Sequence, residues 1–313
     1  LVFGEAMNLN WHHSKTLFTS ALLLAAPGVM LGTVFMGMFI KLLIPYNFSW
    51  LLCLLVGAVL ASTDTVAVLS IMQQAGASPK LTYLIVGESL LNDGTSMVMF
   101  ELFLGLLKQP SLKVWPTQGF IASMTLGSVG LGLAIGLCTV RWLRMVNRPL
   151  KHIDVESQVS ITMIVAYLAF YLAQHVLLIL GLLCIVSAAI MLGWLAPPII
   201  LNRETMHHIW AFFEWTFNTI LFLLSGLIIG HRILVEVNGA DWFFMLAIYL
   251  LSNLTRFLVV GMLYPLLSQM GHKLERNEAG FVIFGGLRGS LGMALGLIIV
   301  DNAEAAGISS SEA

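Results

Sequence analysis

Charged residues are scarce in this sequence. Asp, Glu, Lys and Arg make up only 10% of its 313 residues, against about 25% in an ordinary soluble domain, and 58% of the residues are hydrophobic. The formal net charge is -1 and the basic residues do not cluster, which argues against nucleic acid as a partner. The composition predicts an integral, multi-pass membrane protein that has the lipid bilayer as its main partner.

Cysteines are also few. Cys53, Cys138 and Cys184 lie inside apolar runs and lack the paired spacing of a disulfide framework or a metal site. Packing in an apolar core explains all three. The sequence therefore gives no reason to expect a cofactor.

Long apolar runs fill the chain. A bilayer-crossing helix needs about 20 mostly apolar residues, and the sequence predicts about nine complete crossings. The uncharged run at 157–201 is long enough for two of them, so a turn near His175 should divide it. The predicted spans are 17–40, 48–75, 81–107, 115–140, the two halves of 157–201, 207–230, 242–269 and 279–300. We expect an all-α fold, with residues 1–313 as a single transmembrane transporter domain truncated at both ends.

The basic residues also predict an orientation. Lys and Arg are enriched in cytoplasmic loops, which places the loop with Arg141, Arg144, Arg148 and Lys151 in the cytoplasm. Strict alternation of the spans then puts Lys108 on the opposite side.

Several charged residues remain at the depth of the bilayer, where charge is costly and usually marks an ion or proton pathway. They are Asp64, Glu88, Asp93, Glu101, Glu214, Arg256 and Arg288. For Glu101 and Glu214 a position near a span end, where the carboxylate reaches the interface, is the simpler explanation.

Asp64 lies where a span is interrupted. The run "LASTDTVAV" places hydroxyl residues and Asp64 between two apolar halves that are each too short to cross alone. Unwound backbone is tolerated at this depth only where protein or water supplies partners, and transporters use such breaks to bind ions. The oxygen-rich break suits a small cation, although a polar kink satisfied by neighbouring helices remains the alternative.

Glu88 and Asp93 share one predicted span. They point about 140° apart at about 100° per residue, so they need different partners, whereas Ser89 and Asp93 share a face. A buried arginine cannot lose its proton and requires a counter-charge. We therefore pair Glu88 with an arginine, either Arg256 or Arg288, and leave Asp93 free to titrate.

Arg288 lies in a second candidate for an interrupted helix. The run "FGGLRGSLGMALG" brings Gly285, Gly286, Gly289 and Gly292 into one span. Glycine permits unwinding, as in the repeat architecture of transporters, but close helix packing explains the same residues equally well.

Together these residues resemble a known family. The run "STDTVAVLSIMQQAGASPKLTYLIVGESLLNDGTSMVMF" and the later "GGLRGS" are similar to the cation/proton antiporter family that contains the sodium/proton exchangers, over nearly the whole chain. The resemblance implies an inverted-repeat antiporter fold with two interrupted, crossing helices. It also implies a transporter rather than an enzyme.

The resemblance assigns roles to named residues. It implies that Asp93 and Asp64 bind a cation, transiently Na⁺, or protons in competition. Thr63 and Ser89 would complete the oxygen shell, Asn92 would brace the site, and Glu88 would pair with Arg256. Arg288, with Gly286 and Gly289, belongs to the second interrupted helix. The start of the chain resembles the end of an early family helix, with Glu5 as its acidic residue.

Two features depart from the family. Thr65 stands where the family has proline, which puts the geometry of the break in doubt, and members carry about twelve or thirteen spans rather than about nine. Asn92 stands where electrogenic relatives have a second aspartate, so the chain resembles the electroneutral branch.

The resemblance implies secondary active exchange of a monovalent cation, foremost Na⁺, for H⁺ by alternating access. It further implies a homodimer in the plasma membrane and allows a regulatory cytoplasmic domain beyond these residues. Two other classes use similar features. An intramembrane aspartyl protease also places two aspartates on two spans, but its sequence signatures are absent, and a passive cation channel would use a comparable polar path.

Overall fold

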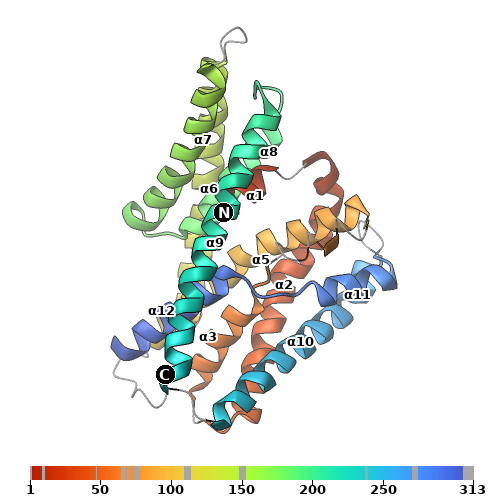
Figure 1. The fold of residues 1–313 in the computed structure, drawn as a ribbon, viewed down its shortest axis with the longest axis vertical. Coiled ribbons are helices and arrows are strands. Elements are labelled where there is room, and N and C mark those ends of the chain that lie inside the picture. The colour runs from red at the N-terminus through yellow and green to blue at the C-terminus, as the bar shows by residue number, and fades with distance from the viewer. Residues whose placement is uncertain are drawn as a thin grey trace. The chain divides into compact units, whose positions relative to one another are not determined.

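Helices form all the regular structure that the computed structural model describes (Figure 1). The described residues are 2–8, 11–46, 48–64, 68, 71–72, 76, 78–108, 114–147, 153–236, 239–269 and 274–305. The helices are α1 (Val2–Asn8), α2 (Trp11–Leu43), α3 (Trp50–Ala61), α5 (Pro79–Lys108), α6 (Val114–Val146), α7 (Ile153–Tyr171), α8 (Gly181–Leu195), α9 (Arg203–Glu236), α10 (Gly239–Leu267), α11 (Arg276–Phe284) and α12 (Ser290–Ala305).

Within the described ranges, 6 helices are long and apolar enough to cross a membrane, namely α2, α5, α6, α7, α9 and α10. Shorter apolar helices occur at Trp50–Ala61, Gly181–Leu195 and Leu291–Val300. The predicted all-helical membrane fold is therefore confirmed. The number of about nine crossings stays a prediction, because length and composition identify fewer full spans.

Two helices end where the sequence predicts interruptions. Helix α3 ends at Ala61, and Ser62 has extended backbone with φ -64° and ψ 138°. Helix α11 ends at Phe284, and 286–289 are not helical before α12 begins (Figure 1). Thr65, which stands where the family has proline, lies outside the described residues.

The uncharged run at 157–201 is divided near His175, as predicted. A π-helical turn at Leu172–Val176 follows α7, and Leu178 then adopts a positive φ of 53°. The side-chain oxygen of Gln174 accepts a hydrogen bond from the backbone N–H of Gly181, which begins α8. Since no charge or proline marks this turn, only the length of the run revealed it.

The chain forms two compact units. The first unit comprises Leu1–Lys15 and Gln118–Thr219, and the second comprises Thr16–Thr117 and Ile220–Ala313. Both interrupted helices belong to the second unit.

Apolar clusters pack the second unit at two levels along α5. One cluster joins α5 to α2, α10 and α11, and its buried α5 residues are Leu81, Leu84 and Ile85. The other, here called the α3–α5–α12 cluster, is built on Leu52, Leu55, Val59, Phe100, Leu104 and Leu295. The polar residues Glu88, Ser89, Asn92 and Asp93 lie between these two levels on α5.

Candidate functional site

The two interruptions meet in the second unit. The backbone N–H of Asp64 donates to the carbonyl oxygen of Leu287 at 2.7 Å, and Arg288 Nη1 donates to the carbonyl oxygen of Ser62 at 3.0 Å. These bonds satisfy backbone groups that the unwound segments leave without helical partners, as an apolar environment requires. The interruptions therefore support one another.

Gly289 allows this close approach. A Cβ at position 289 would lie 2.5 Å from the Cβ of Asp64 and 2.9 Å from its Oδ2. Real carbon atoms do not approach so closely without displacement, so a side chain here would push the two interruptions apart.

Gly289→Ala should consequently destabilise the protein. Overpacking of this kind costs about 1–3 kcal/mol, and the shift would also move Asp64. We expect a lower melting temperature in detergent and reduced transport.

Gly280→Ala is the matched control, because Gly280 is exposed on α11 and a Cβ there meets nothing within 4 Å. Alanine should there favour the helix by about 0.5–1 kcal/mol. Equal melting temperatures for the two variants would contradict the close crossing.

A buried ion pair joins α5 to α10. Arg256 Nη2 lies 2.5 Å from Glu88 Oε1, and the side chains of Arg256 and Glu88 are 11% and 2% exposed. Arg256 Nε and Nη2 also donate to the carbonyl oxygen of Val282 on α11, at 3.3 and 3.2 Å. Gly286 packs against the same arginine. Arg256, rather than Arg288, is thus the counter-charge of Glu88.

Helix α5 braces the break after α3. The Asn92 side-chain amide donates to Thr63 Oγ1 at 2.9 Å and to Glu88 Oε1 at 3.1 Å. The Ser89 hydroxyl donates to the carbonyl oxygen of Thr63 at 2.7 Å. Asn92, Ser89 and Thr63 are all buried, so these bonds fix the position of the unwound segment relative to α5.

Asp93 has a different environment. The Ser62 hydroxyl donates to Asp93 Oδ1 at 2.8 Å, and both Asp93 and Asp64 are partly exposed. Among the described residues, Asp93 forms no ion pair with Arg256 or Arg288. Helical spacing indicates Ser89 as the hydroxyl neighbour of Asp93, but in the structure this neighbour is Ser62, the first residue of the "STDT" run.

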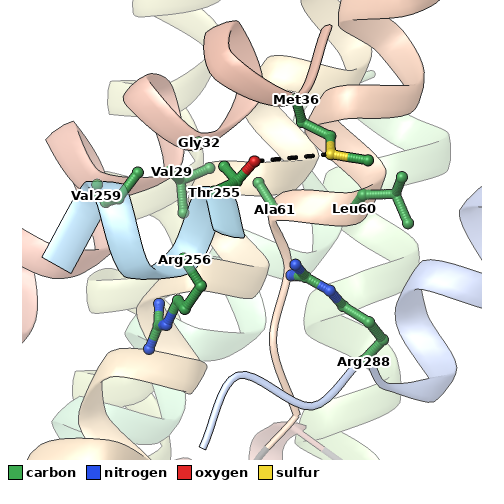
Figure 2. Close-up of a pocket in the computed structure, with 10 residues that line it drawn as sticks. Val29, Gly32, Met36, Leu60, Ala61, Thr255, Arg256, Val259 and Arg288 are labelled. Carbon is green, nitrogen blue, oxygen red and sulfur yellow. Dashed lines mark hydrogen bonds between the residues drawn. The ribbon is translucent and has the colours of Figure 1, made fainter. Parts of the chain in front are cut away.

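Arg288 lines a small pocket beside the crossing (Figure 2). Its guanidinium points toward Leu60 and Ala61 at the end of α3, and its Nη2 reaches the carbonyl oxygen of Ser252 at 3.5 Å. The other lining residues come from α2 and α10 and include Gly28, Gly32, Thr255 and Arg256. Arg288 thereby holds the carbonyl end of α3 against α10 and the second interruption.

The remaining acidic candidates lie on other parts of the chain. Glu5 is on α1 and Glu214 is on the part of α9 that belongs to the first unit. Glu101 lies on α5, beyond Asp93.

Across the described ranges, no three His, Cys, Asp or Glu side chains gather as a metal site. A cation at the two aspartates would therefore complete its shell with hydroxyl, carbonyl or water oxygens.

Comparison with known proteins places this architecture. The family model described as "Sodium/hydrogen exchanger, transmembrane" matches residues 1–312. The chain belongs to this family. The sodium/hydrogen exchanger family, together with the apolar helices, establishes an integral, multi-pass membrane protein.

Two curated relatives are similar over most of the chain. "Sodium/hydrogen exchanger 8" of Arabidopsis thaliana is 34% identical over 305 residues, which are 96% of this chain and 40% of that protein. "Na(+)/H(+) antiporter ApNhaP" of Aphanothece halophytica is 30% identical and is covered over 56% of its length. The chain thus spans about half the length of these relatives, whose names are those of transporters and not of enzymes.

A solved structure shares the fold. The sodium proton antiporter MjNhaP1 from Methanocaldococcus jannaschii, at pH 8, matches with a TM-score of 0.74 at 16% sequence identity. The match covers 100% of this chain and 72% of that protein. The antiporter fold expected from the resemblance is therefore confirmed.

Proposed function

We propose that this chain carries the ion-exchange site of a secondary active antiporter that exchanges a monovalent cation, foremost Na⁺, for H⁺. The charge balance at the crossing carries the proposal. Three carboxylates, Asp64, Glu88 and Asp93, and two guanidiniums, Arg256 and Arg288, lie on the segments that form the crossing. When all are ionised, one negative charge remains, and either one proton or one monovalent cation neutralises it.

Competition for that charge would couple the two fluxes. Asp93 forms no ion pair with either arginine among the described residues, and its hydrogen-bond donor, Ser62, lies two residues before Asp64 at the break. A proton on Asp93 removes the charge that holds the cation, and a bound cation disfavours protonation. Asp64, Thr63 and Ser89 would contribute oxygen ligands, while Asn92 and the Glu88–Arg256 pair hold the segment in place.

The same balance predicts one-for-one exchange. In sealed vesicles containing the full-length parent protein, sodium added to the outside should move protons outward and alkalinise an acid interior. The same assay with potassium or lithium in place of sodium measures the cation selectivity. Clamping the membrane potential at different values should leave the initial rate unchanged, because no net charge moves. A rate that rises with the potential would show another stoichiometry.

Further parts of this proposal concern the whole protein. We propose that residues 1–313 form one transporter domain that opens its site alternately to the two sides of the plasma membrane, in a homodimer. The relatives are longer than this chain, which leaves room for a regulatory cytoplasmic domain. Neither a protease nor a channel is favoured, since the relatives are named as exchangers and antiporters.

A further inference from the structure

Glu101 is a charged residue of α5 to which the site described above gives no role. It is partly buried, and its side chain forms no hydrogen bond or ion pair in the described part of the chain. A charged side chain within a membrane helix is costly at the helix centre, and the cost falls toward the helix ends. Glutamine at this position would avoid this cost, which indicates that the charge of Glu101 has a function.

The position of Glu101 along α5 is informative. The 30 residues of α5 span about 45 Å, more than the bilayer core of about 30 Å, and the helix midpoint falls next to Asp93. Glu101 is about 11 Å from this midpoint and thus just inside the boundary of the apolar core. Two i+4 steps, through Met97, lead from Asp93 to Glu101 along one ridge of the helix.

The surroundings of Glu101 are apolar. Its neighbours on α5, Phe100 and Leu104, belong to the α3–α5–α12 cluster, and Met97 packs against that cluster. Within 50–61 of α3, 97–107 of α5 and 291–300 of α12, Glu101 is the sole charged side chain, and the charge of Lys108, two turns further along α5, acts on it. An ion that passes between Asp93 and the Lys108 end of this bundle therefore meets one carboxylate on the way.

We infer that Glu101 is the entrance carboxylate of the half-path between the Lys108 end of α5 and Asp93. It attracts the cation to the rim of the apolar layer and releases it toward Asp93, about 12 Å further along the helix. This inference rests on the proposed antiport and adds a second cation site to it, on one side of the membrane only.

Sided kinetics test the inference. Glu101→Gln in the full-length protein should raise the KM for Na⁺ about tenfold when Na⁺ is supplied at the Lys108 side, because local cation enrichment is lost. The kcat, and the KM for Na⁺ supplied at the other side, should not change. Vesicles of both orientations provide the two measurements.

Two further variants separate charge from packing. Glu101→Asp retains the charge, so its KM for Na⁺ at the Lys108 side should stay close to the wild-type value. Met97→Leu, a volume-conserving change on the same ridge, should leave both KM values unchanged. An unchanged KM for Glu101→Gln at the Lys108 side, or an equal change at both sides, overturns the inference. Wild-type vesicles that exchange no ions at all would instead refute the proposed antiport.

Discussion

Asp93→Asn should abolish cation-dependent proton flux. Asparagine has nearly the same shape and its amide oxygen can still accept the hydrogen bond from Ser62, which spans 2.8 Å in the wild type. It cannot exchange a proton for a cation, because its charge does not change. Sodium added to acid-loaded vesicles with the variant should produce no more alkalinisation than in protein-free vesicles, while the protein stays folded within about 1 kcal/mol.

Glu156→Gln is the control for the loss of one carboxylate. Glu156 is exposed on α7 and belongs to the first unit, outside the crossing. Its variant should retain the wild-type flux. If Asp93→Asn also retained sodium-dependent flux at the wild-type rate, Asp93 would not be the shared site of cation and proton, and the coupling mechanism would fail with it.

Hydrophobic runs and rare charges were enough to predict the outline of the fold. Both interruptions occur where the sequence predicts them, because unwound backbone in an apolar layer needs polar or glycine residues. The division near His175 also occurs as predicted, because the uncharged run is too long for one crossing. The helix ends were less well predicted. Helix α6 continues to Val146, past Arg141 and Arg144, because hydropathy reports the bilayer and not the end of the helical hydrogen bonding.

The partners within the candidate site were harder to predict. Helical spacing separated Glu88 from Asp93 but left two arginines open for Glu88, and the choice depends on the tertiary packing of α10 against α11. Spacing also put Ser89 beside Asp93. In the structure the Ser89 hydroxyl donates to the carbonyl oxygen of Thr63, which the break has freed from helical bonding. Which carbonyl a break frees is a property of its backbone and cannot be read from spacing.

Glu88→Gln should strongly destabilise the protein. The change leaves the Arg256 guanidinium, 11% exposed, without its counter-charge, and removing one partner of a buried ion pair costs about 3–5 kcal/mol. Arg256→Gln should cost less, because the Glu88 carboxyl can bind a proton and become neutral, whereas arginine stays charged. We expect both variants to melt at lower temperature in detergent, with Glu88→Gln the lower of the two.

The double variant separates the ion pair from other effects. Glu88→Gln with Arg256→Gln removes both charges, so its loss should be clearly smaller than the sum of the single losses, with a coupling energy of about 1–3 kcal/mol. Additive losses would show that the 2.5 Å contact does not hold α5 to α10.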